Sequence, residues 1–117
     1  MAYDEDIANR IRELVGGQGG LTEQRMFGGL AFLIEGNMAI AASGQGGIMV
    51  RVDPSQSDAL VVKTTARPMV MRGREMRGWL RVDADDVRTK RQLVKWVDLG
   101  IGYARTLPAK SAKRAKM

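Results

Sequence analysis

The sequence predicts an α+β fold in which helices lie on one face of an antiparallel sheet, as a two-layer sandwich. Three observations support this. Apolar residues recur at helical spacing near both ends of the chain, and short apolar runs separated by turn residues fill much of the middle. Helix-like and strand-like segments are also grouped rather than regularly alternating. At 117 residues the chain fits one domain, which we expect to cover residues 1–108.

The first predicted element is a helix over residues 4–15. Its apolar residues form one stripe: Ile7, Ile11, Leu14 and Val15. Asp4 and Asp6 are suited to cap its first turn, and the Gly16–Gly17 pair ends it. We expect residues 18–20, which are rich in glycine, to be a flexible connector.

The next part of the chain predicts a three-stranded antiparallel meander. Apolar runs at 30–34 and 38–42 flank residues 35–37, where Gly and Asn tolerate the positive φ of a hairpin turn. A third strand is expected at 48–52. An earlier start of the meander, at 25–27, is a second possibility.

A helix and a second hairpin follow. Asp53 is a suitable N-cap and Pro54 fits the first turn, so a helix is expected over 54–62. Apolar runs at 68–71 and 76–82 predict the two strands of the hairpin.

The last predicted helix extends from Asp83 to about Thr106, and Pro108 ends it. Acidic residues just after Asp83 suit the positive end of the helix macrodipole. Residues 109–117 are basic and almost free of large apolar side chains, so we expect a disordered basic tail. The predicted order is helix, three strands, helix, two strands, helix.

Strand alternation divides the predicted sheet into two faces. The face expected to lie under the helices holds Leu30, Phe32, Ile34, Met38, Ile40, Ile48, Val50, Val52, Met76, Leu80 and Val82. The far face holds Ala31, Leu33, Ala39, Ala41, Met49, Arg51, Arg77, Trp79 and Arg81. Its apolar members, Ala31, Leu33, Ala39, Ala41, Met49 and Trp79, suggest the contact face of a homodimer. Cover by the last helix, or a register shifted by one residue, would explain the same pattern.

The composition narrows the possible chemistry. The chain has no Cys and no His, which removes thiolate nucleophiles, the commonest general base and most transition-metal ligands. We therefore expect no metal, no cofactor and no catalytic residues. The acidic start of the chain is unlike a signal peptide, and no apolar run is long enough to span a bilayer, so a cytoplasmic location and no membrane contact are expected.

Basic residues are concentrated in the second half of the chain. The net charge is +6, yet residues 1–66 carry five basic and eight acidic residues, whereas residues 67–117 carry fourteen and five. The densest cluster consists of Arg67, Arg72, Arg74, Arg77 and Arg81, close to Trp79. Guanidinium groups and an aromatic ring can bind nucleic acid, and the same residues could bind a protein partner or be solvated.

Several short strings resemble the TfoX/Sxy N-terminal-domain family over about residues 5–110. They are MFGGLAF at 26–32, GNM at 36–38, RVDP at 51–54, MxGRxMxGW at 71–79, LxxWV at 93–97 and YARxLP at 103–108. The resemblance implies a fold similar to the type III secretion chaperones, an antiparallel sheet flanked by helices. It also implies a link to the regulation of natural competence, in which founding members act as transcriptional coregulators, and it supplies no catalytic residues.

We therefore expect a non-enzymatic regulatory or interaction module that acts through a protein partner in transcription-linked regulation. Two alternatives remain open at this stage. One is direct nucleic-acid binding through the arginine-rich hairpin and the basic tail, and the other is an enzyme of unknown class that uses neither His nor Cys.

Overall fold

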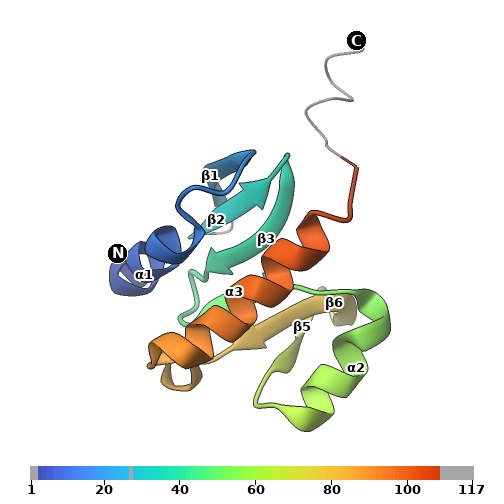
Figure 1. Ribbon diagram of the computed structural model, residues 1–117. Coiled ribbons are helices and arrows are strands. Elements are labelled where there is room, and N and C mark those ends of the chain that lie inside the picture. The colour runs from blue at the N-terminus through green and yellow to red at the C-terminus, as the bar shows by residue number, and fades with distance from the viewer. Residues whose placement is uncertain (1–2, 27, 109–117) are drawn as a thin grey trace.

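The computed structural model describes residues 3–26 and 28–108, so the predicted tail at 109–117 lies outside the described residues. Three α-helices and six strands make up the fold (Figure 1). In chain order they are α1 Glu5–Val15, β1 Leu21–Met26, β2 Gly29–Ile34, β3 Asn37–Ala42, β4 Ile48–Arg51, α2 Pro54–Lys63, β5 Arg67–Met71, β6 Arg74–Val82 and α3 Lys90–Ala104. A short 3₁₀ helix, Ala84–Val87, precedes α3. No helix among these residues is long and apolar enough to cross a membrane.

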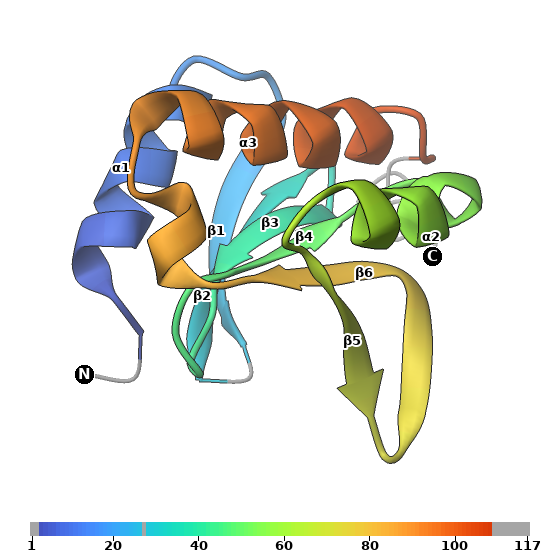
Figure 2. The same cartoon turned by 90° about the horizontal axis from the view of Figure 1, so that it is seen from below.

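All six strands form one open antiparallel sheet in the order β1-β2-β3-β4-β6-β5. Figure 2 shows the three helices on the same side of this sheet. The predicted class, an α+β sandwich with helices on one face, is therefore confirmed. The predicted count of strands is one too low, because the first group has four strands and begins at Leu21. The alternation gave no sign of β1 because residues 22–25 are polar and exposed.

The main core lies between the helices and the sheet. The predicted stripe of α1 is confirmed by Ile7, Ile11 and Val15, each at most 3% exposed. α3 contributes a second stripe: Leu93, Trp96, Val97 and Ile101. The sheet side consists mainly of the predicted residues, including Leu30, Phe32, Ile34, Ile40, Ile48, Val50, Val52, Leu80 and Val82. Met38 and Met76 were predicted for this core and are not part of it.

The last helix begins later than Asp83. Thr89 is its N-cap: the Thr89 hydroxyl accepts from the Gln92 backbone N at 3.1 Å, and the Thr89 backbone N donates to Gln92 Oε1 at 3.0 Å. This reciprocal capping box is a stronger start signal than an acidic residue alone. The acidic residues after Asp83 form the 3₁₀ helix instead.

A β-bulge in β3 explains the misplaced methionine. The register pairs Phe32 with Ile40 and then Leu33 with Met38, so Ala39 is an extra residue without a partner on β2. The bulge turns Met38 to the far face, whereas Ala39 lies fully buried in the core under the helices. The prediction that Ala39 belongs to the far face is therefore wrong.

α3 lies very close to the sheet at Ala39. A Cβ atom built on Gly100 would lie 2.3 Å from the Ala39 carbonyl oxygen. Gly100 therefore permits a helix-to-strand contact that no other residue could make without movement. This contact seats α3 across β3 and β4 (Figure 2).

The strand β6 bends at Gly78, which has a φ of +86°. Pro68 pairs with Leu80 and the next residue of β5, Met69, pairs with Met76, so three residues of β6 have no counterpart on β5. Beyond the bend, the first four residues of β6 are exposed. The tip of the β5–β6 hairpin consequently extends away from the helices (Figure 2).

Candidate functional site

The far face of the sheet carries a second apolar cluster. Its buried members are Ala31, Leu33, Met38, Ala41 and Met49, which are 0–8% exposed. Three partly buried side chains pack against them: Met26, Met69 and Trp79. In the sheet order, β1 lies on one side of this floor and the β5–β6 hairpin on the other.

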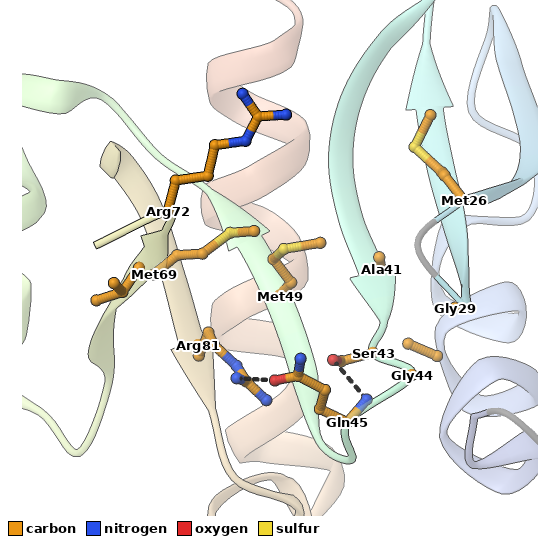
Figure 3. A pocket seen from close by; sticks show the side chains of 12 residues that line it. Met26, Gly29, Ala41, Ser43, Gly44, Gln45, Met49, Met69, Arg72 and Arg81 are labelled. Atoms are coloured by element: carbon orange, nitrogen blue, oxygen red, sulfur yellow. Dashed lines mark hydrogen bonds between the residues drawn. The ribbon is translucent and has the colours of Figure 1, made fainter. Parts of the chain in front are cut away.

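Two adjoining hollows of about 310 and 480 Å³ lie on this face. Met26, Met49 and Met69 line both, so we treat them as one feature, the methionine groove. Its walls and floor further include Leu33, Met38, Arg51, Val70, Arg72, Met76, Trp79 and Arg81. Figure 3 shows Met49 and Met69 meeting at the centre of the smaller hollow, with Met26 across from them on the end of β1.

Five of the eight methionines of the chain line this groove. Methionine is unbranched and polarisable, and its side chain adapts to the shape of whatever packs on it. Met76 is 37% exposed and Val70 is 58% exposed, so apolar surface is accessible along the hairpin wall. A surface of this composition is suited to binding an apolar group rather than to performing chemistry on it.

Among the described residues that line the groove, three are arginines and none is an Asp or a Glu. The Arg51 guanidinium lies 5.0 Å from the centre of the Trp79 ring and 5.6 Å from that of Tyr103. Arg81 donates to the side chain of Gln45 (Figure 3). Arg72 is exposed in the hairpin turn, with a φ of +54°. The groove is therefore apolar at its floor and positive at its sides.

The predicted arginine cluster is divided by the fold. Arg72 and Arg81 line the smaller hollow, and Trp79 lines the larger one. Arg67 instead forms an ion pair with Asp83. Arg77, next to the bend, donates to the Pro54 carbonyl at 3.4 Å, on the side of α2. Arg74 is exposed near the end of the hairpin.

Most of the residues predicted for the dimer face lie together in the structure, unlike those of the arginine cluster. Ala31, Leu33, Ala41, Met49 and Trp79 do come together in the far-face cluster, and all of them except Ala31 line the groove. The floor side chains are almost fully buried, so they do not form the flat exposed contact face that the sequence suggested.

Sequence reasoning missed four of the methionines, namely Met26, Met38, Met69 and Met76, and did not assign Arg51 to a site. The number of methionines was an available signal, since eight in 117 residues is high and most lie on the predicted strands. Their convergence depends on the bulge at Ala39 and the bend at Gly78, which alternation alone does not predict.

The perturbed acids lie outside the groove. Hydrogen bonds from Arg12 lower the pKa of Glu23, on the helix side of β1, where Arg12 Nε lies 2.6 Å from Glu23 Oε2. The pKa of Asp53 is lowered because its carboxylate accepts from the Ser55 backbone N and hydroxyl at the start of α2. No group of three acidic residues in the described part of the chain could hold a metal ion. The groove itself offers apolar contact and positive charge.

Comparison with known families identifies the family of this domain. The model of the TfoX N-terminal domain matches residues 13–104, a span that contains all six strands and every residue of the groove. Comparison with curated proteins and with solved structures gives no match.

Proposed function

The chain belongs to the TfoX N-terminal domain family, and on that premise we propose that it is a regulatory module that binds a protein partner in its methionine groove. The family suggests a module of the competence-regulator type, which is regulatory and non-catalytic. In this proposal the chain acts in the cytoplasm, in transcription-linked regulation, and takes part through binding rather than catalysis.

The observation that carries the proposal is the composition of the groove. Protein interiors are close-packed and leave few voids larger than a water molecule. Here a floor of small and flexible apolar residues is left beneath hollows of about 310 and 480 Å³, with exposed apolar side chains on one wall. Exposed apolar surface bordered by polar groups is typical of interaction sites.

The arrangement favours a protein over a nucleic acid. Proteins that bind single-stranded nucleic acid typically stack successive bases on aromatic rings, and among the described residues that line the groove Trp79 is the one aromatic residue. The dispersal of Arg67 and Arg77 also weakens the case for a continuous phosphate-binding strip. The basic residues at 109–117 lie outside the described residues and carry no part of the proposal.

Affinity capture with matched variants tests the proposal. The double variant Met69→Gln/Met76→Gln keeps side-chain length but makes one wall polar. The control Val62→Gln changes an apolar residue on α2 that is 84% exposed and lies outside the groove. Wild type and control should capture the same partner from lysate of the source organism, and the double variant should recover about tenfold less, corresponding to about 1.4 kcal/mol.

Light scattering of the purified chain completes the test. A dimer that dissociates in the double variant would make a second copy the occupant of the groove. Equal recovery of the partner by the double variant and the wild type would refute the groove as the binding surface. A salt-sensitive complex with duplex DNA that survives in the double variant would favour direct nucleic-acid binding instead.

A further inference from the structure

From the charge and shape of the methionine groove, and resting on the function proposed above, we infer that its occupant is an acidic amphipathic helix. Apolar side chains of the helix insert between Met26, Met49 and Met69. Carboxylates beside them face Arg51, Arg72 and Arg81.

Charge complementarity is the first argument. The salt bridges among the described residues join Arg12 to Glu23, Arg67 to Asp83 and Arg88 to Asp85. Arg51, Arg72 and Arg81 belong to none of them, and the described residues that line the groove include no carboxylate. Two of these arginines contact neutral groups: Arg81 donates to Gln45, and Arg51 lies over the rings of Trp79 and Tyr103. Three uncompensated positive charges around an apolar recess favour a negatively charged ligand.

The spacing of these charges sets where the acids must lie. Arg72 and Arg81 belong to the smaller hollow, and Arg51 belongs to the larger one, with Met49 between the two. A ligand that meets all three must therefore extend along both hollows. It needs acidic residues on both sides of its apolar stripe rather than at one end.

The strand arrangement favours a helix. The floor is made by β2, β3 and β4, each hydrogen-bonded to a neighbour on both sides, so their backbone groups are already paired. An extended peptide in the groove would find no backbone partner there, and burying unpaired N–H and C=O groups is costly. A helix satisfies its own backbone and can insert side chains at positions i, i+3, i+4 and i+7 into an apolar groove.

A second copy of the chain, bound groove to groove, fits less well. A two-fold contact would bring the same three arginines of each copy to one interface. Like charges at an interface oppose association, and the lining residues include no acid to offset them. An acidic helix meets the same surface with opposite charge.

Three labelled synthetic peptides of about 16 residues, long enough to form a helix, provide the test. The first has leucines at helical spacing with glutamates beside them. The second has the same leucines with lysines in place of the glutamates. The third keeps the glutamates but has glutamine in place of the leucines. Fluorescence anisotropy with the wild-type chain should show the first peptide binding at least about tenfold more tightly than either other.

A charge variant of the groove gives a second readout. The triple variant Arg51→Gln, Arg72→Asn, Arg81→Gln removes the three charges, and asparagine tolerates the positive φ at position 72. It should bind the first peptide about tenfold more weakly, and the affinity that remains should depend less on salt. Arg91→Gln, which removes one exposed charge from α3, should bind as the wild type does. Circular dichroism confirms that each variant is folded, and the wild-type comparison stands without any variant.

Several outcomes would overturn the inference. They are equal binding of the lysine peptide, equal binding of the peptide without leucines, and no binding of the first peptide. If one of these occurs while capture of a partner still depends on Met69 and Met76, the groove remains the binding surface and only the acidic helix is refuted. Tight binding of a labelled DNA duplex that is lost in the triple variant would assign the three arginines to nucleic acid.

Discussion

Replacing Gly100 by alanine tests how closely α3 lies on the sheet. A Cβ at this position would be 2.3 Å from the Ala39 carbonyl oxygen and 3.1 Å from Val50 Cγ2. Contacts of a real Cβ are essentially never shorter than 3.0 Å, so the helix and β3 must separate by about 0.7 Å. The atom in the way belongs to the backbone, which cannot rotate aside as a side chain can.

The change in the free energy of unfolding caused by Gly100→Ala is the sum of two opposing effects. Overpacking of this kind costs about 1–3 kcal/mol. Alanine in place of glycine inside a helix stabilises the helix by about 1 kcal/mol. We expect the upper part of the first range because the obstacle is backbone, so Gly100→Ala should lower the free energy of unfolding by about 1–2 kcal/mol. For a chain of this size, each 1 kcal/mol lowers Tm by about 4 °C.

Gly102 provides a matched control in the same helix. It is exposed, and an added Cβ would meet no atom within 4 Å. Gly102→Ala should therefore raise the free energy of unfolding, by up to about 1 kcal/mol. Urea denaturation followed by circular dichroism measures both variants. Stabilisation by both substitutions would show that α3 does not rest on β3 at Ala39, and the packing described above would be wrong.

Three further predictions concern the N-cap of α3, the bend in β6 and the ion pair between α1 and β1. Thr89→Ala removes the capping box of α3 and should cost about 1 kcal/mol in urea denaturation, whereas no change would mean that the cap is not formed in solution. Gly78→Ala forces a side chain into a positive φ against Pro54 and should cost about 1–3 kcal/mol, measured in the same way, and a neutral result would argue against the bend. The lowered pKa of Glu23 means that its contribution to stability is present above its ordinary pKa of 4.5 and is lost as the pH falls below it. Wild type should therefore lose more stability than Glu23→Gln on acidification in low salt, with a smaller difference in high salt, and identical pH profiles would exclude the Arg12–Glu23 pair.

Much of the fold could be predicted because local patterns and tertiary packing agree. The stripe on α1, the glycine turn before β3 and the Asp53–Pro54 start of α2 are local signals, and each element is present. The strand β1 could not be predicted from alternation, since it is an edge strand with polar residues and owes its place to pairing with β2. Tertiary pairing overrides weak local preference in such cases.

The site was harder to predict because it depends on two irregularities. Strict alternation assigns Met38 and Met76 to the core under the helices, and places Ala39 on the far face. The bulge in β3 reverses the assignments of Met38 and Ala39. The bend in β6 changes that of Met76. A one-residue shift in register changes which face a side chain occupies. Sequence reasoning therefore identified the far face as apolar but placed only Met49 of its five methionines there.

The bend at Gly78 has a consequence for how this protein could diverge. On the near side of the bend, β6 alternates into the packed core at Leu80 and Val82, whereas residues 74–77 beyond it are exposed. Insertions or deletions at the tip of the β5–β6 hairpin would thus lengthen or shorten one wall of the groove while the residues that hold the domain together keep their neighbours. Ligand preference can change at this tip independently of the stability of the scaffold.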